Sequence, residues 1–175
     1  TFAELGGKLI DSAPGYGDSE SIIGRIASEL DLRDNLFLAS KVNAEGREEG
    51  LQSIENSLRE MQADPIDLMQ VHSLVDVETQ LPILFELKNQ GRVRHVGISA
   101  WLPNQYQRLL EIIEQDEPLD FIQVDYALDS RRVDERILPL AADKGIAVLA
   151  NLPFGRGRLF EEIDDEPLPD WADDI

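Results

Sequence analysis

Residues 8–11 read Lys-Leu-Ile-Asp, residues 36–41 read Leu-Phe-Leu-Ala-Ser-Lys, and residues 68–72 read Leu-Met-Gln-Val-His. Each stretch is a short apolar run that ends in a residue with a functional side chain. A run of four to eight apolar residues between turn signals is typical of a buried strand. Lys and Asp, however, are almost never fully buried without a partner. The three stretches therefore predict strands whose ends meet in one site.

The same pattern recurs further along the chain. Apolar runs also end at Ser99, at Gln123 and at Ala150, and successive run ends lie 24–31 residues apart. A strand, its crossover helix and the next strand need roughly 30 residues. Strict alternation of strands and helices predicts parallel strands in an α/β fold.

The segment between the first two runs shows the helical spacing. Ile26 lies four and three residues after Ile22 and Ile23, Leu30 lies four residues after Ile26, and all of them follow the possible helix caps Asp18 and Ser19. This spacing predicts a helix whose apolar face consists of these side chains.

Two α/β architectures compete for this alternation. A doubly wound sheet binds its ligand where the strand order reverses, beside a glycine-rich Gly-x-Gly-x-x-Gly turn. A (β/α) barrel collects its site residues from the ends of many strands at one face. Functional strand ends recur along this chain, and no glycine-rich turn of that kind follows any run. The sequence therefore predicts a TIM-type (β/α)8 barrel.

The length predicts that this barrel is incomplete. A (β/α)8 barrel has about 250 residues, and roughly 200 as a lower bound, whereas this chain has 175. We expect about six of the eight βα units, in residues 1–160. Residues 161–175 contain eight acids and no base, and we interpret them as an acidic tail or a loop that leads to the missing part.

Composition limits the partners. The formal net charge of −19, from 16 Lys and Arg against 35 Asp and Glu, argues against nucleic-acid or anionic-membrane binding. No apolar run approaches the 18 residues of a membrane span. The chain has no cysteine, which excludes disulfides and thiolate metal sites. We expect a cytoplasmic protein without a membrane or nucleic-acid partner, and the sequence leaves its oligomeric state open.

The strand-end residues suit carbonyl chemistry. Asp11 and Lys41 end neighbouring strands, so they can form an ion pair, and a buried cation beside a phenol lowers the pKa of that phenol. Tyr16, in the Gly/Pro turn after Asp11, could then exchange a proton near neutral pH. His72 could donate a hydrogen bond to a substrate oxygen on which charge develops. The chain has no hydride donor of its own, so a nicotinamide cofactor is implied.

At these residues the chain resembles the aldo-keto reductases, over most of its length. Six stretches in order carry this resemblance: 9–17 (Leu-Ile-Asp-Ser-Ala-Pro-Gly-Tyr-Gly), 37–42 (Phe-Leu-Ala-Ser-Lys-Val), 66–72 (Ile-Asp-Leu-Met-Gln-Val-His), 91–99 (Gly-Arg-Val-Arg-His-Val-Gly-Ile-Ser), 121–124 (Phe-Ile-Gln-Val) and 145–150 (Gly-Ile-Ala-Val-Leu-Ala). The resemblance implies a (β/α) barrel that reduces carbonyl compounds with NADP(H) or NAD(H).

The resemblance also implies roles for individual residues. The family's Asp/Tyr/Lys/His tetrad matches Asp11, Tyr16, Lys41 and His72, with Tyr16 as the acid. The positions implied for the cofactor are Ser99 and Gln123 at the nicotinamide, then Asn151, Leu152, Pro153, Phe154 and Gly155 in the loop along the pyrophosphate. Trp101 occupies a position suited to the substrate pocket.

Two positions depart from the family's pattern. Ala100 replaces the Asn that commonly follows the serine at position 99, and Asn151 replaces the aromatic residue that stacks on the nicotinamide. The family's late basic segment, which binds the adenosine phosphate, would follow Ile175, so the sequence does not distinguish NADP from NAD. With that segment absent and the barrel open, we expect the isolated fragment to bind nucleotide weakly or not at all, and the sequence leaves open whether the fragment is active.

Two other functions remain open at this point. Lys41 at a barrel strand end could be the Schiff-base nucleophile of an aldolase, or the barrel could bind nucleotide without catalysing a reaction. A metal hydrolase is poorly supported because His72 and His95 are the only histidines and form no His-x-His pair. We therefore expect no metal site.

Overall fold

Six parallel strands form one sheet in the computed structural model, which describes residues 2–115 and 118–163. They lie side by side in chain order, so the predicted order of adjacent parallel strands is confirmed. The strands are β1 (Leu9–Asp11), β2 (Phe37–Val42), β3 (Ile66–Val71), β4 (Val93–Ala100), β5 (Phe121–Asp125) and β6 (Ala147–Asn151).

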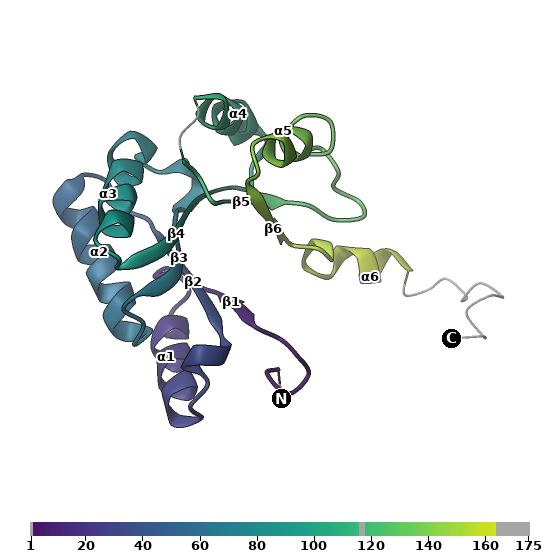
Figure 1. The fold of residues 1–175 in the computed structure, drawn as a ribbon. Coiled ribbons are helices and arrows are strands. Elements are labelled where there is room, and N and C mark those ends of the chain that lie inside the picture. The colour runs from purple at the N-terminus through teal and green to yellow at the C-terminus, as the bar shows by residue number, and fades with distance from the viewer. Residues whose placement is uncertain (1, 116–117, 164–175) are drawn as a thin grey trace.

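Helices connect the strands and lie on the outer side of the curled sheet (Figure 1). They are α1 (Ser19–Glu29), α2 (Arg47–Glu60), α3 (Val77–Asn89), α4 (Tyr106–Glu114) and α5 (Ile137–Asp143), followed after β6 by α6 (Arg158–Ile163). Short 3₁₀ turns occupy Arg33–Asn35, His72–Leu74, Pro103–Gln105 and Gly155–Gly157. This curled α/β arrangement confirms the predicted (β/α) barrel with six of its strands present.

The hydrophobic core lies between the sheet and the helices. All six residues of β3 are buried, as expected of a central strand in a parallel sheet that is covered on both faces. From the helices, Ile54, Leu84 and Leu109 have no exposed surface. This packing holds the carboxyl ends of the strands at fixed positions.

The strand register brings the polar residues to one level of the sheet. Lys41 pairs with Gln70, Gln70 pairs with Gly97, and Ser99 pairs with Gln123. At Gly97 a Cβ atom would lie 2.8 Å from the carbonyl oxygen of Phe121 and 3.2 Å from the Cγ atom of Gln70. The absence of a side chain at Gly97 therefore allows the long Gln70 side chain to lie across β4.

Helix α1 forms where it was predicted, but the predicted apolar face was wrong. Ile22, Ile26 and Leu30 are exposed, by 44%, 42% and 58%, while Gly24 and Ala27 are buried. The physical reason is close packing: a Cβ atom at position 24 would collide with the backbone of Glu60, the last residue of α2, and of Met61, which follows it. The small residues thus face the neighbouring helix. Of the predicted face only Ile23 is partly buried and packs against the core, while Ile22, Ile26 and Leu30 face solvent.

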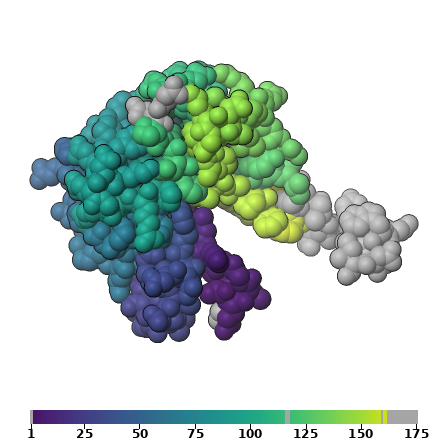
Figure 2. Space-filling model, viewed as in Figure 1, coloured from purple at the N-terminus to yellow at the C-terminus, as the bar shows by residue number. Residues whose placement is uncertain are grey.

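The two ends of the sheet lie apart. Among the described residues, β1 pairs only with β2 and β6 only with β5, as predicted for an open sheet. The space-filling view shows a hollow side between the N-terminal residues and α6 (Figure 2). Most of the predicted acidic tail, residues 164–175, lies outside the described residues, and 161–163 belong to α6.

Candidate active site

Asp11 and Lys41 form a buried ion pair across β1 and β2. The Lys41 side chain is 2% exposed, and its Nζ atom donates a hydrogen bond to Asp11 Oδ2 at 2.5 Å. It donates another to the carbonyl oxygen of Ser12 at 2.8 Å. Burial lowers the pKa of Lys41 because the charged form loses hydration, and the Asp11 carboxylate opposes that effect. The predicted ion pair is confirmed.

Two amide side chains hold Asp11 from the other side. Gln123 Nε2 donates to Asp11 Oδ2 at 2.9 Å, and Gln70 Nε2 donates to Asp11 Oδ1 at 3.2 Å. Asp11 therefore accepts hydrogen bonds from β2, β3 and β5. Sequence reasoning missed Gln70, although a polar residue inside the apolar run 68–71 was the signal that could have found it.

Tyr16 lies in the turn after β1, above the ion pair. Its ring centre is 5.3 Å from Lys41 Nζ and 6.2 Å from the His72 ring, which it meets edge to face. Burial and the Asp11 charge raise the pKa of Tyr16, while Arg156 lowers it. The expected lowering of the Tyr16 pKa was therefore wrong, because the loss of hydration on burial and the Asp11 charge together outweigh the effect of nearby cations.

His72 follows β3 directly and begins a 3₁₀ turn. Its Nδ1 atom is buried and has no hydrogen-bond partner among the described residues. Burial and, to a smaller extent, Lys41 lower the pKa of His72, so the imidazole is neutral at pH 7. A neutral ring carries one N–H donor, which is the form that can hydrogen-bond a carbonyl oxygen.

One pocket of about 270 Å³ joins these groups to the later strands. Its walls comprise Tyr16, Lys41, His72, Ser99, Trp101, Gln123, Asn151, Leu152 and Arg156. Of the loop residues predicted for the cofactor, Pro153, Phe154 and Gly155 lie outside this lining, and Phe154 packs against Phe160 with ring centres 5.3 Å apart. Sequence reasoning gave Arg156 no side-chain role.

The polar groups of the pocket fit a nicotinamide carboxamide. Ser99 Oγ accepts a hydrogen bond from the backbone N–H of Ser73 at 2.9 Å, which leaves its own proton free to donate. Gln123 Oε1 accepts only a long bond of 3.4 Å from Gln70, so it can accept another donor. An amide needs one donor and one acceptor, and Ser99 and Gln123 supply both.

A second polar contact lies behind the pocket, between α1 and β2. Ser40 Oγ donates to Glu20 Oε1 at 2.5 Å, and both side chains are buried. On the same turn, Ser12 Oγ donates to Ser19 Oγ at 2.9 Å. These bonds hold both ends of the turn that carries Tyr16. Sequence reasoning gave Ser12, Glu20 and Ser40 no role.

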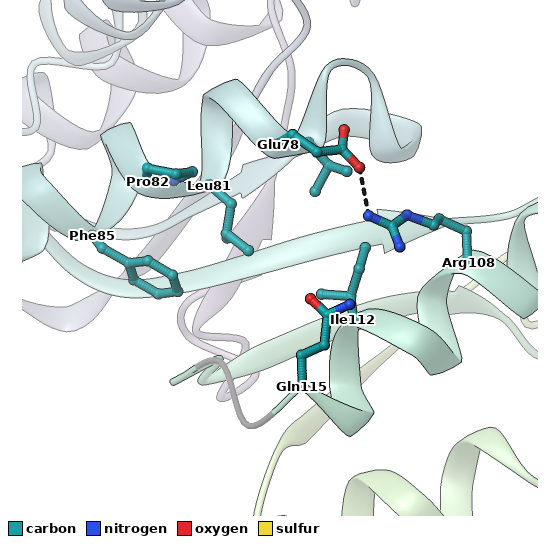
Figure 3. Close-up of a pocket in the computed structure, with 8 residues that line it drawn as sticks. Glu78, Leu81, Pro82, Phe85, Arg108, Ile112 and Gln115 are labelled. Atoms are coloured by element: carbon teal, nitrogen blue, oxygen red, sulfur yellow. Dashed lines mark hydrogen bonds and ion pairs between the residues drawn. The ribbon is translucent and has the colours of Figure 1, made fainter.

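Another cavity, of about 230 Å³, lies between α3 and α4 (Figure 3). Its walls are largely apolar, with Leu81, Phe85 and Ile112, and its charged residues Glu78 and Arg108 pair with each other. It shares no residue with the Tyr16 pocket. Among residues 2–115 and 118–163, no group of acidic or histidine side chains could hold a metal ion, and no helix could span a membrane.

Comparisons with known proteins agree on one family. The sequence matches the aldo/keto reductase family over residues 1–173. It is 34% identical over 173 residues to the aldo-keto reductase YhdN of Bacillus subtilis, covering 90% of this chain and 51% of the relative. It is 26% identical over 192 residues to the NADH-specific methylglyoxal reductase of Escherichia coli, covering 94% and 57%. The chain thus spans about half the length of the curated relatives it matches.

Solved structures show the same likeness. An aldo/keto reductase from Klebsiella pneumoniae in complex with NADP and acetate has a TM-score of 0.79 at 25% identity, covering 94% of this chain and 59% of that one. The holo form of an aldo-keto reductase from Bacillus halodurans has a TM-score of 0.75 at 27% identity, covering 97% and 59%.

Proposed function

Because the chain belongs to the aldo/keto reductase family, we propose that the protein reduces an aldehyde or ketone to an alcohol with a hydride from NADPH or NADH. The observation that carries this proposal is the convergence of Tyr16, Lys41 and His72 on one pocket, with Asp11 bound to Lys41. The similar proteins include examples for either coenzyme: one is named an NADH-specific reductase, and the structure of another was determined in complex with NADP.

The proton balance of the reaction assigns the central role to Tyr16. A bound nicotinamide coenzyme supplies the hydride that adds to the carbonyl carbon. Negative charge then develops on the carbonyl oxygen, and the Tyr16 hydroxyl donates its proton to that oxygen. The phenolate that remains recovers a proton from solvent. Because burial and Asp11 raise the pKa of Tyr16, the phenol is protonated at neutral pH, which favours the direction of reduction.

His72 and Lys41 assist this transfer without exchanging a proton with the substrate. The neutral His72 imidazole can donate its N–H to the carbonyl oxygen and orient it. Lys41, held by Asp11, places a positive charge 5.3 Å from the Tyr16 ring, where it stabilises phenolate as it forms. In this proposal Ser99 and Gln123 hold the nicotinamide carboxamide, and the loop 151–155 follows the phosphates.

The geometry weakens the aldolase alternative. A Schiff-base lysine must present a neutral amine to the substrate. Lys41 instead uses two of its N–H groups on Asp11 and on the carbonyl oxygen of Ser12, and its side chain is 2% exposed. These contacts favour a fixed cation over a nucleophile.

A coenzyme assay tests the proposed function. We expect the full-length protein that contains this chain to oxidise NADPH or NADH, followed by nicotinamide absorbance, only when an aldehyde or ketone is present. Borohydride treatment with the carbonyl substrate and no coenzyme should leave Lys41 unmodified by mass spectrometry. Turnover without coenzyme, together with a reduced adduct on Lys41, would instead establish the aldolase.

A further inference from the structure

Arg156 lies at the wall of the Tyr16 pocket, over the ring of Trp101. The guanidinium carbon is 5.9 Å from the centre of the Trp101 ring, and both side chains line the pocket together with Tyr16 and His72. An arginine over the face of an indole is held in place electrostatically while its N–H donors stay available at the edge of the plane.

The charge of Arg156 is not balanced inside the site. Lys41 is paired with Asp11, so that pair contributes no net charge to the pocket. Within the described part of the chain, no carboxylate forms an ion pair with Arg156, whereas arginines such as Arg47, Arg92 and Arg108 do have acidic partners. An unpaired cation lining the pocket is notable in a chain with a net charge of −19.

The backbone at Arg156 supports a functional role for this position. Arg156 has φ 60° and ψ 31°, the left-handed conformation that favours glycine, between Gly155 and Gly157, which also have positive φ. Such unfavourable conformations of non-glycine residues concentrate at active sites and ligand clamps.

We propose that Arg156, seated on Trp101, binds a carboxylate of the carbonyl substrate, so that the preferred substrates are oxo acids or aldehyde acids. The planar guanidinium can form two parallel hydrogen bonds to a carboxylate. The inference rests on the proposed function, because it assigns the substrate class of the same site.

A phosphate of the coenzyme offers similar oxyanion chemistry, but the neighbours of Arg156 favour the substrate. The guanidinium of Arg156 lies over the Trp101 ring, and its charge lowers the pKa of the proposed acid Tyr16. Phe154 and Pro153, in the loop proposed to follow the phosphates, lie outside the pocket lining that contains Arg156.

Arg156→Gln in the full-length protein tests the proposal with two matched substrates, an oxo acid and its uncharged methyl ester. The variant should reduce kcat/KM for the acid by about 10- to 100-fold, the usual range for losing hydrogen bonds to a charged group. The loss should appear mainly in KM, because the interaction exists before the transition state. For the ester kcat/KM should change less than about threefold, and Arg156→Lys should keep part of the preference for the acid. Arg132→Gln, which removes a charge outside this pocket, should affect neither substrate.

Two results would overturn the inference. One is an equal loss for acid and ester with weaker NADPH binding, which would assign Arg156 to a coenzyme phosphate. The other is an unchanged preference for the acid in Arg156→Gln.

Binding without turnover separates this inference from the proposed function. The chain has two tryptophans, so Trp171→Phe leaves Trp101 as the only indole reporter. Titration with the oxo acid should quench Trp101 fluorescence, and Arg156→Gln should weaken that binding by at least about tenfold. If binding depends on Arg156 but the protein reduces no carbonyl compound, the proposed anion site stands and the proposed reductase function is refuted. Binding that does not depend on Arg156 would refute the anion site whatever the activity.

Discussion

Lys41 experiences two opposing effects, and their balance sets the chemistry of the site. Burial disfavours its charge, while Asp11 at 2.5 Å favours it. Removing one partner of a buried ion pair leaves the other charge uncompensated, so neither residue can be replaced without disturbing its neighbours. Tyr16 and His72 both respond to this pair, because Asp11 raises the pKa of Tyr16 and Lys41 lowers the pKa of His72.

The titration of His72 tests this electrostatic coupling directly. Because burial and Lys41 disfavour the imidazolium, NMR titration should give His72 a pKa below the ordinary value of about 6.5. Lys41→Met removes the cation and should raise it, whereas Lys8→Met, outside the pocket, should not. The chain has two histidines, so His95→Gln assigns the His72 signal. A His72 pKa at or above the ordinary value would contradict the coupling.

The same shift has a consequence for stability. The unfolded chain binds a proton at His72 at higher pH than the folded chain does, so folding stability contributed by neutral His72 is fully present above about pH 6.5. That contribution is lost as the pH falls through this value toward the lower folded pKa.

At the scale of elements, strand β2 and the start of α1 contact each other and hold the turn 12–18, which carries Tyr16, in place. The bond from Ser40 to Glu20 joins them, and the backbone N–H of Ser12 donates to the carbonyl oxygen of Ala39 at 2.9 Å. Contacts between elements therefore hold the turn in addition to its own hydrogen bonds, such as the one from the Tyr16 backbone N–H to the carbonyl oxygen of Ala13 at 3.0 Å.

Ser40→Ala should destabilise the protein because it leaves the buried Glu20 carboxylate without its donor. An unsatisfied buried polar group costs about 1–3 kcal/mol, and urea denaturation should show a decrease of that size in the free energy of unfolding. Ser28→Ala, at an exposed position of the same helix, should change it by less than about 0.5 kcal/mol. Equal small effects of the two changes would show that the contact does not hold α1 against β2.

The sequence predicted most helices and strands, but it did not predict which residues of one element contact those of another. Apolar runs indicated all six strands, because such runs are a local pattern, and five of the six lead to a polar residue. The buried face of α1 was not predictable, because periodicity identifies an apolar stripe at Ile22 and Ile26 but not the neighbour that covers it. Gln70 and Glu20 escaped notice for the same reason: their partners, Asp11 and Ser40, lie 59 and 20 residues away.

At the scale of the whole molecule, the site exists only because the sheet keeps its strands in chain order. The pocket draws residues from the end of every strand or from the segment that follows it, from Tyr16 after β1 to Arg156 after β6. The curl of the sheet in Figure 1 turns these ends toward one another on the inner side. The proposed chemistry is therefore a property of the assembled sheet rather than of any single motif.

The central claim is that this assembled site reduces a carbonyl with Tyr16 as the proton donor. The most direct test is kcat for coenzyme-dependent carbonyl reduction by the full-length protein carrying Tyr16→Phe, which keeps the ring and removes the proton. Tyr126→Phe is the matched control outside the pocket. General acid catalysis contributes about 10²–10⁴-fold, so kcat should fall by that factor in Tyr16→Phe, with little change in coenzyme affinity, and stay near the wild-type value in Tyr126→Phe. Near wild-type turnover in Tyr16→Phe, combined with inactivity of Lys41→Met, would contradict the account and favour Lys41 as a nucleophile.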